Sequence, residues 1–288
     1  MVTDLNNIIN NPHWQELIKK IQQMTLMDDV FFNSFMDNNF GAMEYILNII
    51  MSRADLRVSH IQAQHSVPNL YGRSVRFDVF ATDQYGNEYN FEVQNANDGA
   101  EPKRARYNID MLDFRKLNAG DDFDKLPETY VIFITAQDVL SYGLPIYHIE
   151  RCIMEVSQQF NDKAHIIYVN GENTDDTPLG KLMQDFKQPD ADKMHSKLLS
   201  DRMKYLKSTK EEVTKMCNIV EEYSAKRFDE GVRVGERRGE RRGERKGKHK
   251  MILQNIKSLM RNKHFSATEA MEALSIDKAQ YSRYLALL

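Results

Sequence analysis

The stretch of sequence that decides the fold is VRFDVFATDQYGNEYNFEVQ, residues Val75–Gln94. Both of its ends, Val75–Phe80 and Tyr89–Gln94, alternate apolar and polar residues with the two-residue period of a β-strand. Asp83–Asn87, between them, is composed of residues that favour turns. The stretch therefore predicts a β-hairpin.

The register of this hairpin determines which polar side chains meet. If the loop is symmetric about Tyr85, opposed residues have numbers that add up to 170, which places Asp78 opposite Glu92. Arg76 and Gln94 then form the next opposed pair on the same face. The apolar residues fall on the other face, which we expect to pack on the core: Val75, Phe77, Val79, Tyr89, Phe91 and Val93.

Two opposed carboxylates point to a cation. Like charges directly opposite each other destabilise a sheet, and a divalent ion between Asp78 and Glu92 would remove that cost. Magnesium binds one or two carboxylates together with water and substrate phosphate, and it can then activate water for hydrolysis. The alternative is an ordinary water-washed hairpin face on which Arg76 softens the repulsion.

The neighbouring segments predict an α/β domain. We expect helix over Met27–Met51, with a break at Asn38–Gly41, and a basic helix from Pro102 to Leu117. The apolar run Thr129–Thr135 predicts a central buried strand, and His165–Val169 predicts a further strand. Helices and strands in this order indicate one layered α/β domain over residues 1–192.

Beyond residue 192 the pattern is helical without strands. In the segment 193–230, Leu199, Leu206, Val213 and Val220 recur every seven residues. They predict a helical seam that packs either on a second copy of the chain, giving a homo-oligomer, or on the chain's own domain.

The last two segments are a basic stretch and a small helical tail. The segment 231–250 is a Gly/Arg/Glu-rich linker or helix, either contacting DNA phosphates or forming solvated surface. The segment 251–288 reads as a small helical pair with a capping box at Ser266–Glu269, which is either a helix-turn-helix or an assembly module.

Composition excludes several classes of protein. The 288 residues are 41% hydrophobic and 28% charged, as in a globular protein. The net charge of −3 combines +6 in residues 231–250 (nine Lys/Arg, three Glu) with −9 elsewhere, so a uniformly basic nucleic-acid binder is excluded. Apolar runs are too short for a membrane span, and the N-terminus lacks the layout of a secretion signal. We expect a cytoplasmic protein in which Cys152 and Cys217 are buried free thiols.

Several short stretches, in this order, resemble one known family. They are Asp29–Phe32, Glu44–Ile50, Arg76–Phe80, Gly86–Gln94, Lys103–Tyr107, Leu117–Gly120 and Tyr130–Ile134, within a match from Met27 to Asp192. Together they look like the PD-(D/E)XK nuclease family transposases, also called recombination-promoting nucleases (Rpn). The resemblance implies a restriction-endonuclease-like core, with a mixed central sheet flanked by helices, followed by an all-helical C-terminal region.

The resemblance also implies metal-dependent DNA cleavage and assigns residues to it. Asp78 matches the metal-binding aspartate, and Glu92 matches the acidic residue of the (D/E)XK element. Gln94 stands where the wider superfamily has lysine, so it can orient a water but cannot supply a positive charge. The carbonyl of Val93 and the carboxylate of Glu44 are further candidate ligands for Mg²⁺ or Mn²⁺.

The helix that follows the hairpin supplies candidate DNA contacts. Lys103, Arg104, Arg106 and Tyr107 are the residues that we expect to contact phosphates, although one helix packed on a sheet cannot direct all four inward. The sequence thus predicts a metal-dependent DNA endonuclease associated with transposition or recombination. The alternative is a catalytically silent DNA-binding or assembly factor that acts through its helical C-terminal region.

Overall fold

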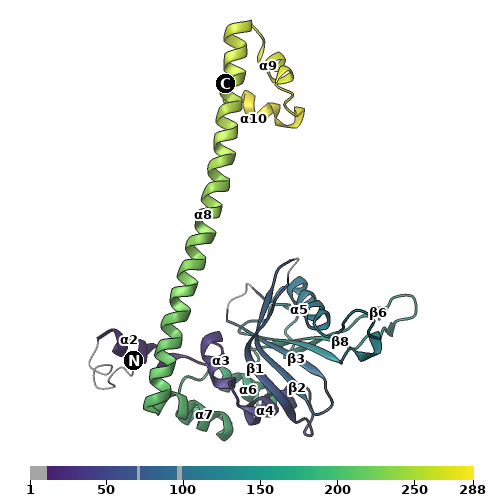
Figure 1. Cartoon of the computed structure of the whole chain (residues 1–288), viewed down its shortest axis with the longest axis vertical. Helices are drawn as coiled ribbons and strands as arrows, with labels where there is room; N and C mark the ends of the chain where they lie inside the picture. The colour runs from purple at the N-terminus through teal and green to yellow at the C-terminus, as the bar shows by residue number, and fades with distance from the viewer. Residues whose placement is uncertain (1–11, 70–71, 96–98) are drawn as a thin grey trace. The chain divides into compact units, whose positions relative to one another are not determined.

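The computed structural model describes residues 12–69, 72–95 and 99–288. Contacts along the chain separate two compact units, Met1–Glu221 and Glu222–Leu288, which are described in turn. The first unit contains the hairpin and every strand (Figure 1). The long helix α8 (Lys210–Lys263) begins in the first unit, and the rest of it belongs to the second.

A mixed sheet of six strands forms the centre of the first unit. Its strand order is β1-β2-β3-β4-β8-β5, with parallel pairing of β3 with β4 and of β4 with β8 and antiparallel pairing elsewhere. The strands are β1 (Val58–Val67), β2 (Val75–Asp83), β3 (Glu88–Gln94), β4 (Thr129–Thr135), β5 (Ile146–Ile149) and β8 (Ala164–Asn170). This mixed sheet with flanking helices is the restriction-endonuclease-like fold that the sequence predicts.

The hairpin forms with the expected register. Val79 pairs with Phe91 and Thr82 with Glu88, so that paired numbers add up to 170. The loop is fixed by the Asp83 carboxylate, which accepts hydrogen bonds from the backbone N–H groups of Tyr85 and Asn87. The expected strands at Thr129–Thr135 and His165–Val169 are present as β4 and β8.

One helix covers the first face of the sheet. The helix α5 (Pro102–Phe114) connects the parallel strands β3 and β4, because parallel neighbours require a crossover. Its buried residues Ala105, Ile109 and Leu112 pack in one hydrophobic cluster with Phe133 and Tyr168 of the sheet. This face also carries Asn90 and Glu92, which are completely buried, whereas Arg76 at the start of β2 is exposed.

The second face of the sheet is covered as well. Ile132, Ile134 and Val169 alternate with the residues that face α5, and each is completely buried. The helix α3 (Asp29–Met36) contacts β1, β2 and β3, and α4 (Phe40–Ile50) contacts β1 (Figure 1). The break expected at residues 38–41 is confirmed: α3 ends before it, and Asn39 caps α4 by accepting the N–H of Ala42.

The remaining helices of the first unit are α2 (Pro12–Gln23), α6 (Pro178–Lys187) and α7 (Lys197–Ser208). The seven-residue pattern of the sequence is divided between α7 and α8. Leu199, Leu206 and Val220 are buried within this one chain, and α7 contacts α3 and α4. Three of the four positions are thus buried within this chain, whereas Val213 is half-buried.

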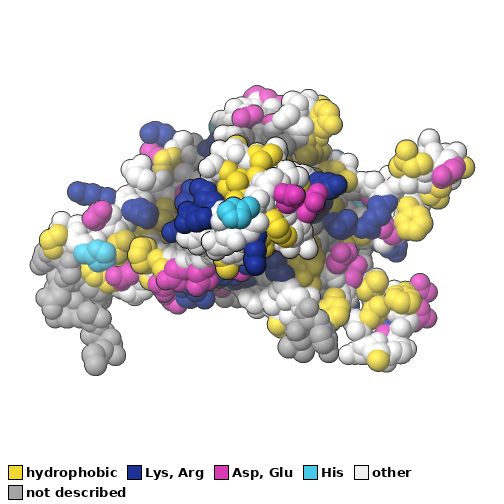
Figure 2. All heavy atoms as spheres, turned by 90° about the horizontal axis from the view of Figure 1, so that it is seen from above, with side chains coloured by type: hydrophobic (Ala, Val, Ile, Leu, Met, Phe, Trp, Pro, Cys, Tyr) yellow, Lys and Arg dark blue, Asp and Glu magenta, His cyan; other side chains and the backbone are white. Residues whose placement is uncertain are grey.

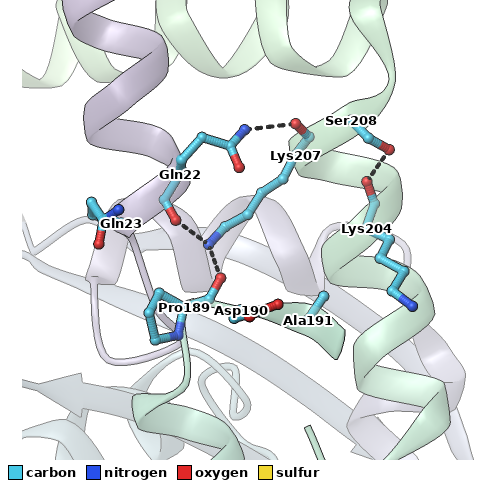
Figure 3. A pocket seen from close by; sticks show the side chains of 8 residues that line it. All are labelled: Gln22, Gln23, Pro189, Asp190, Ala191, Lys204, Lys207 and Ser208. Atoms are coloured by element: carbon cyan, nitrogen blue, oxygen red, sulfur yellow. Dashed lines mark hydrogen bonds between the residues drawn. The ribbon is translucent and has the colours of Figure 1, made fainter. Parts of the chain in front are cut away.

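A buried lysine connects three segments of this unit. Lys207 Nζ donates hydrogen bonds to the carbonyl oxygens of Gln22, Met24 and Pro189 at 3.0, 2.6 and 2.7 Å. Gln22 returns a bond from its side-chain amide to the carbonyl oxygen of Lys207, beside a pocket of about 340 Å³ (Figure 3). The ammonium group thus joins the ends of α2 and α6 to α7.

The second unit has a small hydrophobic core of its own. This core consists of Ile256 on α8, Ala270 and Met271 on α9 (Ala267–Ala273), and Tyr284 on α10 (Tyr281–Leu285). The expected capping box is confirmed: Ser266 accepts the N–H of Glu269, and the Glu269 carboxylate accepts the N–H of Ser266.

One expectation about the cysteines is wrong. Cys217 is buried, but Cys152 is exposed because it lies on β6 (Cys152–Ile153), which pairs only with the short strand β7 (Gln158–Gln159) outside the main sheet. No described helix is both long and apolar enough to cross a membrane. On the face seen in Figure 2, basic, acidic and hydrophobic side chains all reach the surface.

Candidate active site

The two carboxylates of the hairpin lie where its strands separate. The ladder between β2 and β3 ends at the pair Val79 and Phe91, although both strands continue. Beyond that point Asp78 takes the place of the missing backbone partner: its Oδ2 accepts the backbone N–H of Val93 at 3.0 Å. The Asp78 side chain therefore lies against the backbone next to Glu92.

Glu92 is completely buried beneath α5. Its Oε2 forms an ion pair with Arg104 Nη2 at 2.6 Å. Its Oε1 accepts weaker bonds from the amide groups of Asn90 and Asn108, at 3.3 and 3.4 Å. Arg104 and Asn108 both come from α5, so the helix that follows the hairpin in sequence also fixes the position of its carboxylate.

Both carboxyl groups are less acidic than usual. Burial raises the pKa of Asp78 to about 6, against the hydrogen bond from Val93, and Asp29 adds repulsion. Burial and the neighbouring Asp78 raise the pKa of Glu92 to about 8, in spite of Arg104. The hydrogen bond from the Val93 N–H places the Asp78 carboxylate next to Glu92, so the structure brings these two predicted residues together.

Gly99 leaves space for the side chains of Gln94 and Arg104. A Cβ atom added to Gly99 would lie 2.5 Å from Gln94 Oε1 and 2.9 Å from Arg104 Nη1. Gly99 also has φ +115°, a backbone conformation that other residues rarely adopt. Only glycine at this position allows the amide of Gln94 and the guanidinium of Arg104 to lie side by side.

The carbonyl of Val93 faces the same side of β3 as its N–H group. In a strand, the N–H and C=O groups of one residue face the same neighbouring strand. Because the Val93 N–H bonds to Asp78, its carbonyl also faces the gap beyond the end of the β2–β3 ladder. The gap thus collects oxygen atoms from Asp78 and Val93, next to Glu92.

The structure does not bring Glu44 to this gap. Its Oε1 accepts the N–H of Val58, at the start of β1, and Val58 pairs with Asp83. Asp83 is five residues from Asp78 along β2, a separation of roughly 16 Å at about 3.3 Å per residue. Sequence analysis missed Asp29, at the start of α3, which is close enough to Asp78 to raise its pKa.

The four residues predicted to contact DNA have different environments. Lys103 and Arg106 are exposed on α5, whereas Arg104 is engaged by Glu92. Tyr107 donates its hydroxyl hydrogen to the carbonyl oxygen of Arg73. Lys103 and Arg106 are therefore accessible to phosphates, and Arg104 acts within the protein.

The donor atoms fit a hard divalent cation. Two carboxylates and a backbone carbonyl are the oxygen ligands that Mg²⁺ and Mn²⁺ prefer. Next to Glu92, the buried Oδ1 atom of Asn90 has no hydrogen-bond partner among the described residues. The part of the chain that the structure describes contains no group of three or more His, Cys, Asp or Glu arranged for a metal. Water and substrate phosphate would complete the coordination.

The fold and this pair of acidic residues define a class, the PD-(D/E)XK type of nuclease core. The family model of the PD-(D/E)XK nuclease family transposases matches residues 36–259, and the chain belongs to this family. Membership implies a nuclease that acts on DNA, in a group of enzymes that generally use divalent metals. No curated protein and no solved structure matches the chain.

Proposed function

We propose that this protein is a metal-dependent DNA endonuclease that hydrolyses phosphodiester bonds during transposition or recombination. The observation that carries the proposal is the pair formed by the half-buried Asp78 and the buried Glu92 at the end of the β2–β3 ladder. Both groups have a raised pKa. A protein that keeps two such groups together is suited to bind a cation there.

Each residue of the site has a role in this proposal. Asp78, Glu92 and the Val93 carbonyl would hold Mg²⁺ or Mn²⁺, and Glu44 is left out because of its distance. The cation would polarise the phosphodiester, activate a water and neutralise the leaving oxygen. Gln94 orients the water whose oxygen attacks phosphorus, and Lys103 and Arg106 hold neighbouring phosphates. The bond to the leaving oxygen then breaks, and that oxygen takes up a proton.

Arg104 has a positioning role. Because it already pairs with Glu92, it fixes the carboxylate and reduces the cost of keeping it ionised under α5. Gln94 brings no charge to the transition state, so stabilisation of the developing negative charge depends on the cation.

The test is a plasmid cleavage assay with Mg²⁺ or with EDTA. We expect EDTA-sensitive nicking by the parent protein and a loss of at least about 100-fold in Asp78→Asn, since several kcal/mol of metal-dependent stabilisation disappear. Asp110→Asn, on the exposed side of α5, is the matched control and should cleave normally. Equal cleavage by the parent and Asp78→Asn would exclude Asp78 from the mechanism.

One observation favours a second candidate function. Arg104 already neutralises Glu92, and among the described residues no group of three or more His, Cys, Asp or Glu is arranged to hold a metal ion. A catalytically silent protein that binds DNA would have the same site. In the same assay it would retard DNA in a gel without nicking it in either Mg²⁺ or Mn²⁺.

A further inference from the structure

The segment Gly231–Lys250, which we call the basic arm, has a repeat of four residues. Its central part reads Gly-Glu-Arg-Arg from Gly235, again from Gly239, and then Gly-Glu-Arg-Lys from Gly243. The whole segment lies within α8, and every residue from Gly231 to Lys248 is exposed. The basic arm lies in the second unit, and only His249, whose ring contacts Tyr284, approaches the hydrophobic core there among the described residues.

A repeat of four on an α-helix places like charges together. Residues four apart are neighbours on the helix surface. Glu236 is therefore followed by Glu240 and Glu244, while the basic residues form two adjacent rows. These rows are Arg233, Arg237, Arg241 and Arg245, and Arg238, Arg242, Lys246 and Lys250. The repeat thus separates the charges into one acidic row and two basic rows.

This arrangement gives the helix little internal support. Solvated helices are commonly stabilised by a glutamate followed four residues later by a lysine or arginine. Among the described residues of the basic arm, only Glu244 and Lys248 form such a pair. Arg237 with Glu240, and Arg241 with Glu244, stand three apart in the less favourable order, and neither forms an ion pair in the structure. Five glycines weaken the helix further.

A helix that is polar on all sides needs one of a few sources of stability. It bridges domains through solvent, it carries many paired charges, or it is unstable alone. The repeat rules out extensive pairing, and it also makes the arm a poor rigid spacer. A binding partner of opposite charge supplies the missing stabilisation, because it neutralises both basic rows at once.

We propose that the basic arm binds the phosphate backbone of the DNA that the nuclease cleaves. This inference rests on the proposed function for the identity of the nucleic acid. The twenty residues of the arm extend for about 30 Å as a helix. Duplex DNA presents about one negative charge per 1.7 Å of axis, so both basic rows have phosphates within reach. Contacts of this kind position the protein on DNA without reading its sequence.

A membrane surface is the other common polyanion, and the arm is not built for one. Helices that lie on membranes bury an apolar face among the lipids. From Gly235 to Lys250 the arm has no aliphatic or aromatic apolar side chain, and Val232 and Val234 stand at its start. The arm can therefore bind a partner only through its charges, and contact with the DNA phosphate backbone needs nothing more.

The experiment measures DNA binding by the full-length chain without cleavage. All variants are made in the Asp78→Asn background, here called the carrier, which does not cleave in EDTA. Each protein is titrated against a labelled duplex of about 30 base pairs, which is long enough to span the arm. The fourfold variant Arg237→Gln, Arg238→Gln, Arg241→Gln, Arg242→Gln removes two charges from each basic row. The matched control, Lys257→Gln, Arg261→Gln, Lys263→Gln, Lys278→Gln, removes four exposed charges from the same unit outside the arm.

Binding is recorded over a range of salt concentrations. Each lost phosphate contact lowers the steepness of a plot of log K against log salt concentration by about 0.9. The slope measured for the arm variant should therefore be less steep by about 3 to 4. At physiological salt its affinity should fall at least about tenfold, and the control should lose less than about 1 in steepness. Parallel titrations with anionic lipid vesicles should show no binding that depends on the arm.

Each contrary result has a definite meaning. An arm variant with the slope and affinity of the carrier would overturn the proposal, and so would an equal loss in the control, which would indicate a general effect of charge. Arm-dependent binding to vesicles but not to DNA would identify a membrane surface instead. Because this assay involves no cleavage, a failure of the nuclease proposal in the plasmid assay leaves its result unaffected.

Discussion

At the scale of residues, Asp78 and Glu92 make the site costly to fold in the absence of a cation. Both carboxyl groups have a pKa raised first by burial, and repulsion from a neighbouring carboxylate adds to the shift of each. A carboxyl group whose pKa is higher in the folded than in the unfolded state stabilises the fold while it is protonated. That contribution is complete below the unfolded pKa, near 4, and is lost as the pH rises through the folded pKa.

The metal-free protein should therefore become less stable between pH 4 and pH 8. Asp78→Asn keeps an acceptor for the Val93 N–H but carries no charge. We expect it to be more stable than the parent by about 3 kcal/mol at pH 8, since the pKa of Asp78 is raised by about two units and each unit corresponds to about 1.4 kcal/mol. The difference should vanish at pH 4, where both side chains are neutral.

Urea unfolding in EDTA at the two pH values measures this difference. Addition of Mg²⁺ at pH 8 should stabilise the parent and leave Asp78→Asn nearly unchanged. Equal stability of the two proteins at pH 8 would mean that the Asp78 carboxylate is not destabilised in the fold.

Arg104 should be required for stability in a way that its neighbour Arg106 is not. Removing one partner of a buried ion pair costs about 3–5 kcal/mol. Arg104 is 36% exposed, and Glu92 can take up a proton, so we expect a smaller loss of about 2 kcal/mol for Arg104→Gln at pH 8. Arg106→Gln, on the exposed side of the same helix, should change the stability by less than about 0.5 kcal/mol. Similar losses in both variants would contradict a specific role for the Arg104–Glu92 pair.

At the scale of elements, local sequence patterns were sufficient to predict the hairpin of β2 and β3 but not the neighbouring strand β1. The strict alternation in β2 and β3 and the turn residues at Asp83–Asn87 predicted both strands and their register. The neighbouring strand β1 was missed because its alternation is interrupted. The pairing shifts between Val58 and His60, and Gln64 has a positive φ of 50°. An irregular strand has no constant period for a sequence to show.

The nearness of Asp78 and Glu92 was predictable from the sequence to the same degree. The register brings Asp78 near Glu92 through neighbouring strands, which a local pattern can show. The burial of Glu92 under α5 and its pairing with Arg104 depend on how the helix docks, and no local pattern contains that information. The contact of Glu44 could not be predicted either. Its position on a helix does not reveal that its carboxylate accepts a hydrogen bond from the start of β1.

The backbone after β3 supports the site through Gly99. In Gly99→Ala the new methyl group would displace Gln94 or Arg104, in addition to straining a positive φ. We expect a loss of at least about 2 kcal/mol in stability and a decrease in cleavage of at least about tenfold. Gly86→Ala is the matched control, since Gly86 also has a positive φ but no atom within 4 Å of the added Cβ. It should cost about 1 kcal/mol and leave cleavage intact, and a Gly99→Ala protein that behaves in the same way would show that the close contact is unimportant.

At the scale of the whole molecule, the seven-residue pattern had two interpretations that sequence alone could not separate. A buried row on a helix has the same appearance whether its cover is a second copy or the same chain. Within the single chain, Leu199, Met203 and Leu206 are at most 1% exposed. They belong to the core of the first unit although they follow the last strand by almost thirty residues.

The place where the chain is truncated should therefore decide whether the first unit folds. A fragment of residues 1–195 loses Leu199, Met203 and Leu206, whose burial is worth about 1.5–3 kcal/mol each. That sum is comparable with the whole stability of a domain, about 5–15 kcal/mol, so we expect this fragment to lose cooperative unfolding. A fragment of residues 1–226 retains α7 and the buried start of α8, and it should unfold cooperatively in urea. It should also nick plasmid DNA with Mg²⁺, but with a weaker dependence of affinity on salt, because the basic arm is absent. Cooperative unfolding of the shorter fragment would show that α7 is not part of this core.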